Sequence, residues 1–222
     1  MGTLYLLRHG QASFGATNYD VLSPLGQRQS ERLGQYWAAQ GLRFDAVYSG
    51  SLQRHVDTWA GVCRGAGWEQ NATPWQALNE FDSEALIAAI HPHPLERPTD
   101  PKDAKQHFRL LRDGLTQWMA GVITPTGMNS YEAFAQGVRT VLSDIRHQGL
   151  ERVLIVSSGG PISTAIGQVL GVSPEQTIAL NYRIRNTAVS ELVFGAKRFE
   201  LNTFNTLAHL DGPEFASWWT YA

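Results

Sequence analysis

The stretch TLYLLRHG, residues 3–10, decides the fold, because an apolar run ends in it at a charged and nucleophilic pair. Residues 3–7 have the pattern of a strand that is covered on both faces. Arg8 and His9 follow directly, where such a strand opens into a loop. Ligands of open α/β sheets bind at the carboxyl ends of strands. A guanidinium suits a phosphate dianion and a neutral imidazole can attack phosphorus, so the stretch predicts a phosphate site at the end of a buried strand.

Strands alternate with helices along most of the chain. A Ser23-Pro24 cap predicts the start of a helix, and Gly41 stands where a helix would end. The further elements that we expect are a strand at 44–48, a helix at 51–64, a strand at 153–157, a helix ending near Gly171, a short helix beginning at Ser173-Pro174, and an edge hairpin of 187–194 and 197–204. This alternation predicts an α/β fold, a three-layer α/β/α sandwich with a mainly parallel central sheet.

The middle of the chain differs from this pattern. Helical patterns cover 83–90, 103–119 and 131–147, and a proline-rich stretch at 92–101 interrupts them. We therefore expect a single domain spanning residues 1–222, with a helical insertion at about 82–130. Such an insertion would either cover an active site or pack against the sheet edge, and the sequence leaves both open.

Composition excludes several classes of protein. The 222 residues carry a formal net charge of −2, which gives no electrostatic footprint for nucleic acid or an anionic membrane. The lone Cys63 excludes an internal disulfide framework and fits a reducing compartment. We see no signal peptide and no apolar run of the ~20 residues that span a bilayer. A soluble, cytoplasmic protein is expected. The terminal residues 218–221, WWTY, are expected to dock onto the domain or onto a dimer partner.

Five short motifs extend the first stretch into a recognisable series. They are RHG at 8–10, SPLGQRQ at 23–29, YSGSLQR at 48–54, LNE at 78–80 and VSSGG at 156–160. With them the chain resembles the histidine phosphatase superfamily, in its phosphoglycerate-mutase-like branch. The resemblance runs in order from residue 3 to about residue 193, with an unmatched middle between 81 and 128.

The resemblance implies a set of catalytic roles. His9 would be the nucleophile, Arg8 and Arg54 would clamp the phosphate, and Glu80 would be the proton donor and later the base. Gln11 is a further candidate donor to the substrate. No metal or other cofactor is implied, because arginines can supply the positive charge that phosphoryl transfer requires.

Ser158 stands where the family normally carries a second catalytic histidine. A hydroxyl still donates one hydrogen bond, but it is neutral and shorter. Losing a charge-assisted bond costs ~1.5–3 kcal/mol, and removing a transition-state donor slows turnover ~10²–10³-fold. Gly159 and the turn at 159–161 are expected to direct backbone N–H groups toward the pocket. Some relatives carry a phosphate-binding asparagine at the position of Gly15, and Asn18 is a candidate to replace it.

Another histidine could reach into the space that Ser158 vacates. His55 is predicted to be a poor substitute, because side chains of adjacent helical residues point about 100° apart. The sequence does not rank the remaining candidates, which are His91, His93 and His209.

Three functions remain open at this point. The first is a metal-independent phosphomonoesterase that works through a phosphohistidine on His9, with reduced activity. The second is a catalytically silent domain that binds a phosphorylated ligand or protein. The third is a serine hydrolase with Ser158 as nucleophile, although Val156 occupies the first glycine position of the Gly-x-Ser-x-Gly elbow. The partner would be a small phosphorylated substrate or a phosphoprotein, and the oligomeric state stays open.

Overall fold

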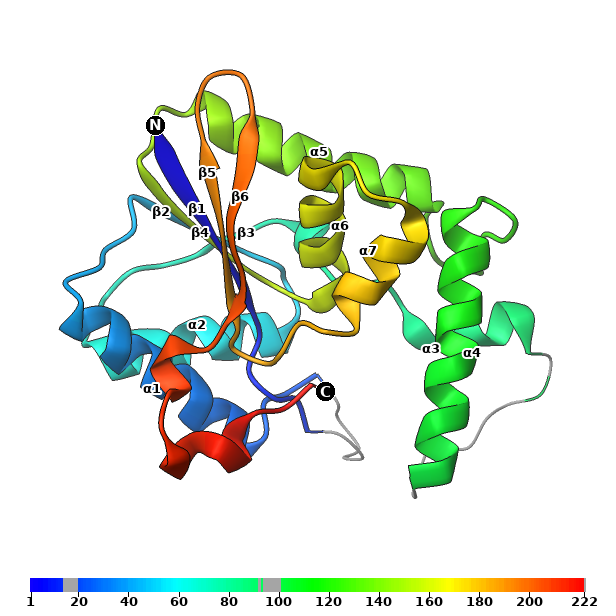
Figure 1. The fold of residues 1–222 in the computed structure, drawn as a ribbon, viewed down its shortest axis with the longest axis horizontal. Coiled ribbons are helices and arrows are strands. Elements are labelled where there is room, and N and C mark those ends of the chain that lie inside the picture. The colour runs from blue at the N-terminus through cyan, green and yellow to red at the C-terminus, as the bar shows by residue number, and fades with distance from the viewer. Residues whose placement is uncertain (14–19, 92, 94–100, 222) are drawn as a thin grey trace.

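A mixed six-stranded sheet forms the centre of the protein (Figure 1). The structure, a computed structural model, describes residues 1–13, 20–91, 93 and 101–221, and the strand count refers to these residues. The strands are β1 (Gly2–Arg8), β2 (Ala46–Ser49), β3 (Thr73–Pro74), β4 (Arg152–Ser157), β5 (Val189–Phe194) and β6 (Phe199–Thr206), in the order β3-β2-β4-β1-β5-β6.

The sheet is parallel except for its last two strands. β4 pairs in parallel with both β1 and β2, and β2 pairs in parallel with β3. β5 runs antiparallel to β1, and β6 antiparallel to β5 at the edge of the sheet. These pairings confirm the mainly parallel sheet and the predicted edge hairpin, although β5 begins at Val189 rather than at residue 187.

β1 is buried on both faces, as its apolar run predicts. Side chains of a strand point alternately to opposite faces. Leu4 and Leu6 accordingly belong to one hydrophobic cluster and Leu7 to another, and each is at most 1% exposed. Because β1 is covered on both sides, its carboxyl end lies inside the molecule.

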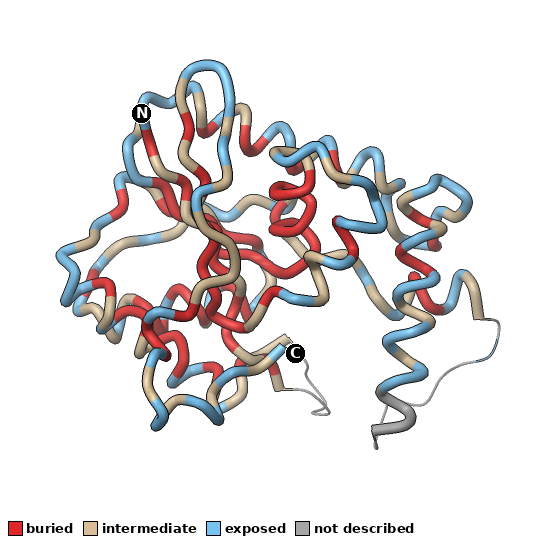
Figure 2. The backbone as a smooth tube through the Cα atoms, in the orientation of Figure 1, coloured by how far each residue is buried: buried red, intermediate tan, exposed pale blue. Residues whose placement is uncertain are grey.

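Helices cover both faces of the sheet. α1 (Pro24–Ala39) and α2 (Gln53–Ala66) pack on the face of Leu7, and α5 (Tyr131–His147) and α6 (Gly159–Leu170) on the face of Leu4 and Leu6. This arrangement confirms the three layers. Figure 2 shows that α6 is among the most deeply buried helices, since its residues 159–167 are all buried.

Local signals set the ends of α1 as predicted. The Ser23 hydroxyl accepts from the Gly26 N–H at 3.0 Å, and Pro24 occupies the first helical position. Gly41 takes a φ of 66° directly after the last turn, a conformation that glycine adopts without strain. α2 begins at Gln53, two residues later than its pattern predicts.

The middle of the chain forms helices that pack against one another. A short η1 (Gln76–Leu78) precedes α3 (Ser83–Ile90), and α4 (Pro101–Met119) follows. Leu86 of α3, Leu115 and Trp118 of α4 share a separate hydrophobic cluster with Ile178 of α7 (Pro174–Asn181). In Figure 1, α4 stands to one side of the sheet. Residues 92 and 94–100 of the proline-rich stretch lie outside the described residues.

The C-terminal segment docks onto the same chain. After η2 (Ala208–Leu210) and η3 (Pro213–Trp218), the backbone carbonyl of Trp218 accepts from the Gln29 side chain at 2.6 Å. The Asn186 N–H donates to the carbonyl of Thr220 at 2.9 Å. The predicted docking is therefore confirmed within the protomer. No helix in the described part of the chain is both long enough and apolar enough to cross a membrane.

His209 predicts a pH dependence of stability. It is 2% exposed and its Nε2 lies 3.0 Å from the Thr187 hydroxyl. Burial and then the Arg32 charge lower the pKa of His209 from 6.5 to about 3. As the pH falls, His209 is therefore protonated in the unfolded chain before it is protonated in the folded protein. The free energy of unfolding keeps the contribution of neutral His209 above pH 6.5 and loses it as the pH falls below that value. Between pH 7 and 5 the loss is about 2 kcal/mol.

The measurement is denaturant unfolding at both pH values. His209→Gln should lose about 2 kcal/mol less than the wild type over this interval. An identical pH response in wild type and His209→Gln would contradict the prediction.

Candidate active site

The residues predicted to form the site follow three neighbouring parallel strands, β2, β4 and β1, at their carboxyl ends. Arg8, the last residue of β1, stands opposite Ser157, the last residue of β4. The His9 N–H donates to the Ser157 carbonyl at 2.9 Å, and the Gly50 N–H donates to the Val156 carbonyl at 3.0 Å. The residues that follow β1, β2 and β4 are thereby brought together.

His9 is held in one orientation. It is 3% exposed, and its Nδ1 lies 2.7 Å from the Gly10 carbonyl. Because a carbonyl only accepts, Nδ1 carries the hydrogen and Nε2 carries the lone pair. The backbone of the loop is fixed by the Asn186 amide, which donates to the His9 carbonyl at 3.1 Å. An imidazole with this tautomer is a nucleophile at Nε2.

The surroundings keep His9 neutral. Burial, then the charges of Arg8 and Arg54, and then His55 hold the pKa of His9 well below its usual range. At pH 7 the ring is therefore unprotonated. Arg8 and Arg54, to which the resemblance assigns phosphate binding, thus also act on the pKa of His9.

The two arginines lie on different elements. Arg8 ends β1 and its Nη1 donates to the Ile184 carbonyl. Arg54 lies in the first turn of α2, is 8% exposed, and its Nη1 pairs with Asp20 Oδ1 at 2.7 Å. The other oxygen of Asp20 accepts from the Gln53 N–H at 2.9 Å. Asp20 therefore holds both the guanidinium and the start of α2.

Glu80 reaches the start of α6. Each carboxylate oxygen lies 3.2 Å from the Gly160 N–H, and a Cβ at Gly160 would come within 2.1 Å of Oε1. The loop before Glu80 is tied to β4, because the Ser157 hydroxyl donates to the Leu78 carbonyl at 2.6 Å. Burial raises the pKa of Glu80, while the Gly160 N–H, Arg54 and Arg8 oppose the rise. A carboxyl with a raised pKa suits a proton donor.

Gln11 and Gly159 have contacts of their own. The Gln11 side-chain oxygen accepts from the Ser23 hydroxyl at 2.8 Å, which joins the loop after β1 to α1. Gly159 is the first residue of α6, and a Cβ there would come within 2.2 Å of Asn181 Oδ1. Gly15 and Asn18 lie outside the described residues.

Ser158 and His55 form a buried pair that the sequence did not predict. Ser158 precedes α6 and does not cap it with its hydroxyl; Oγ lies instead 2.7 Å from His55 Nε2. Both residues are 0% exposed. The centroids of the His55 and His9 rings are 5.7 Å apart, at an interplanar angle of 43°. His55 was predicted to be a poor substitute because its side chain should diverge from that of Arg54, but the divergence does not carry it away from Ser158.

The reason lies at the start of α2. Adjacent helical side chains do diverge, but Arg54 and His55 both lie in the first turn of α2, close to the ends of the strands. Two side chains can therefore diverge there and still both reach the site. Burial and then Arg54 lower the pKa of His55 to about 3, so this ring is also neutral at pH 7. One signal in the sequence could have predicted the role of His55: it stands next to Arg54 in a chain that has serine instead of histidine at position 158. Of the other histidines, His91 contacts His93 and His209 contacts Thr187.

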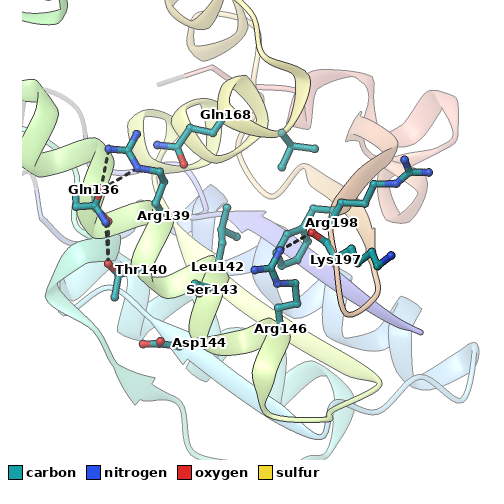
Figure 3. Close-up of a pocket in the computed structure, with 12 residues that line it drawn as sticks. Gln136, Arg139, Thr140, Leu142, Ser143, Asp144, Arg146, Gln168, Lys197 and Arg198 are labelled. Carbon is teal, nitrogen blue, oxygen red and sulfur yellow. Dashed lines mark hydrogen bonds between the residues drawn. The ribbon is translucent and has the colours of Figure 1, made fainter.

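A separate basic pocket lies elsewhere on the molecule. Figure 3 shows it between α5, α6 and the turn that joins β5 to β6. It has a volume of about 570 Å³ and includes Arg139, Arg146 and Arg198 in its lining. Arg146 donates to the Lys197 carbonyl at 2.8 Å. The residues that line this pocket include no histidine that could act as a nucleophile. The candidate active site is therefore the group of residues around His9 at the carboxyl ends of the strands.

Known proteins are similar to this chain in sequence. The chain is 28% identical over 206 residues to a 2,3-bisphosphoglycerate-dependent phosphoglycerate mutase 1 of Nitrosomonas europaea, covering 80% of this chain and 86% of the relative. It is 22% identical over 218 residues to a broad-specificity phosphatase of Saccharomyces cerevisiae, covering 96% and 89%.

Solved structures are similar as well. A phosphoserine phosphatase variant from Entamoeba histolytica, in complex with phosphoserine, matches with a TM-score of 0.65 and 21% identity over 95% of this chain and all of its own. The sequence profile described as histidine phosphatase superfamily (branch 1) matches residues 4–207. With that match over nearly the whole sequence, the chain belongs to the histidine phosphatase superfamily.

Proposed function

We propose that this protein is a metal-independent phosphomonoesterase that works through a phosphohistidine on His9. The observation that carries the proposal is a neutral, buried imidazole whose Nδ1 is bound to the Gly10 carbonyl, with Arg8 and Arg54 close enough to act on its pKa. Membership of the superfamily and the phosphatase named among the relatives support it.

The reaction takes place in two steps. In the first, His9 Nε2 attacks phosphorus, the bond to the leaving oxygen breaks, and Glu80 gives its proton to that oxygen, which leaves as an alcohol. In the second, water attacks the phosphohistidine, Glu80 takes a proton from the water, and the P–N bond breaks to release phosphate. Arg8 and Arg54 bind the non-bridging oxygens and stabilise their charge in both steps.

The raised pKa of Glu80 fits its double role. Burial favours the protonated form that the first step needs. The Gly160 N–H favours the carboxylate that the second step needs. A carboxyl between these influences can exchange a proton in both directions within one catalytic cycle.

The substrate class is a small phosphate monoester or a phosphoprotein. We interpret 1–222 as one domain with a helical insertion at about 82–130, the described part of which adjoins the site. Phe81, next to Glu80, supports this because its ring lies 5.7 Å from that of Trp118 in α4. Phosphoserine, the ligand named for the Entamoeba protein, is a suitable test substrate. Hydrolysis is favoured over mutase chemistry, which must retain and return the phosphoryl group and gains from a full set of donors.

The Ser158–His55 contact favours a second candidate, serine hydrolysis. The contact of 2.7 Å is that of a nucleophile and its base. However, His55 Nδ1 faces the backbone of Gly50, where a catalytic triad has a carboxylate. Labelling of Ser158 by a fluorophosphonate would identify this activity. The neutral Ser158 also leaves open a catalytically silent domain that only binds a phosphorylated ligand.

The test of the proposed function is hydrolysis of p-nitrophenyl phosphate from pH 5 to 8 with a chelator present. The wild type should turn over, and His9→Ala should lose turnover by about 10⁴-fold or more, as removal of a nucleophile does. The exposed His147→Ala is the control and should match the wild type. Alkaline quenching during turnover should trap phosphate on His9.

Two results would contradict the proposal. Turnover that persists in His9→Ala would remove His9 as nucleophile. A wild type that binds inorganic phosphate but never turns over would indicate the silent binding domain.

A further inference from the structure

We propose that His55, acting through Ser158, supplies the imidazole that this family normally places at position 158. The inference rests on the proposed function of His9 as the phosphoryl acceptor. His55 is then a positioning residue that polarises the Ser158 hydroxyl, and this hydroxyl donates to a phosphoryl oxygen.

The imidazole of His55 comes from α2, whereas a histidine at position 158 would come from the start of α6. His55 extends from α2, and its Nε2 lies 2.7 Å from the oxygen that extends from residue 158 at the start of α6. Its ring centroid is 5.7 Å from that of His9. The two side chains together span the space that one histidine at 158 would occupy.

The small residues around the pair are consistent with this exchange. A Cβ at Gly50 would come within 2.1 Å of His55 Nδ1, so the ring fits only because residue 50 is a glycine. A histidine at 158 would extend from the point where Ser158 Oγ already touches Nε2. Imidazoles at 55 and 158 therefore exclude one another, and a serine at 158 accommodates the histidine at 55.

Burial makes a purely structural role for the ring costly. His55 and Ser158 are both 0% exposed, and His55 lies beside the charge of Arg54. Burying a polar group costs free energy unless it is hydrogen-bonded, and an apolar side chain would fill the same space without that cost. The retained contact between Nε2 and Oγ points to a use in the chemistry.

The arrival of substrate explains how the pair acts. In the described structure His55 Nδ1 has no hydrogen-bond partner, so the neutral ring can carry its hydrogen on Nε2 and donate it to Ser158 Oγ. The hydroxyl hydrogen of Ser158 then points to a phosphoryl oxygen. The bond from Nε2 makes this hydroxyl a stronger donor, and the ring needs no additional proton.

The experiment is a double-mutant cycle with a rescue. His55→Ala and Ser158→Ala should each lower kcat for p-nitrophenyl phosphate by about 10²-fold, and the double variant should lose no more than either single variant, because the two residues act as one unit. His55→Ala combined with Ser158→His should recover to within about ten-fold of the wild type. Ser163→Ala removes another buried hydroxyl of α6 and should stay near wild type.

Melting temperatures separate this role from packing. If His55→Ala does not fold, His55→Leu takes its place, since it fills the space with an apolar side chain that cannot donate to Ser158. A folded His55 variant with wild-type kcat would overturn the proposal. So would losses that multiply in the double variant, or a folded rescue variant that recovers nothing.

Binding of orthovanadate distinguishes failure of this inference from failure of the proposed function. If the wild type does not turn over but binds vanadate, the phosphatase proposal fails and vanadate affinity decides the inference. A loss of affinity of about 10²-fold in both single variants would then support it. Unchanged affinity, or a wild type that binds no vanadate, would overturn it.

Discussion

Replacing Arg54 with methionine is expected to lower kcat/KM for p-nitrophenyl phosphate by about three orders of magnitude. Arg54 is 8% exposed, where its charge is poorly screened, and it acts on both His9 and Glu80. An arginine that stabilises the charge of a transferring phosphoryl group contributes ~10³–10⁵ in rate. The measurement is steady-state kinetics at pH 7. The kcat/KM of Arg54→Lys should lie between those of the wild type and Arg54→Met, because lysine keeps the charge and lacks the planar guanidinium.

Arg64 offers a matched control on the same helix. It pairs with Glu31 at 3.0 Å, as Arg54 pairs with Asp20, but its side chain is 54% exposed. Arg64→Met should leave kcat/KM unchanged within about two-fold, since an exposed ion pair contributes little. If Arg54→Met lost no more activity than Arg64→Met, Arg54 would not bind the transferring phosphoryl group.

Glu80→Gln is expected to slow the hydrolysis of phosphoserine by ~10²–10⁴-fold and that of p-nitrophenyl phosphate far less. The serine alkoxide needs a proton as it leaves, whereas p-nitrophenolate leaves without one. Comparing kcat/KM isolates phosphoryl transfer to His9 from the later hydrolysis. Because burial raises the pKa of Glu80, the protonated form reaches further toward neutral pH, and kcat/KM for phosphoserine should fall as the pH rises through that pKa.

Glu84 provides the control for this comparison. It is an exposed carboxylate on α3, and Glu84→Gln should affect neither substrate. Equal losses for both substrates in Glu80→Gln would contradict a role as proton donor. They would indicate instead that Glu80 acts by holding the Gly160 N–H and the start of α6.

Elements with strong local signals could be predicted from the sequence. The apolar run before Arg8 predicts a doubly covered strand, and β1 is one. Ser23 and Gly41 mark the ends of α1 because a hydroxyl cap and a left-handed residue act within a few residues. α2 begins at Gln53 instead of residue 51, since its N-cap Leu52 makes no side-chain cap bond that would mark the start.

The sequence also determined part of the site. Residues that follow parallel strands lie at the same end of a sheet, so His9 and Ser158 were expected at one end once their strands were expected in one sheet. The structure shows that these strands, β1 and β4, are neighbours. The expectation needs no knowledge of side-chain packing. The family motifs extended it to Arg54 and Glu80, whose proposed roles the experiments above test.

Only the tertiary structure decided which side chains face one another across the site. The Ser158–His55 contact joins residues 103 positions apart, and the contact of Glu80 with Gly160 joins residues 80 apart. Whether His55 points inward depends on the rotation of α2 about its axis, which is set by the packing of Trp59 and Val62 against the sheet and α1. A local pattern specifies that a helix forms and which side is apolar. The direction of one polar residue at its first turn follows only from the packing of the whole layer.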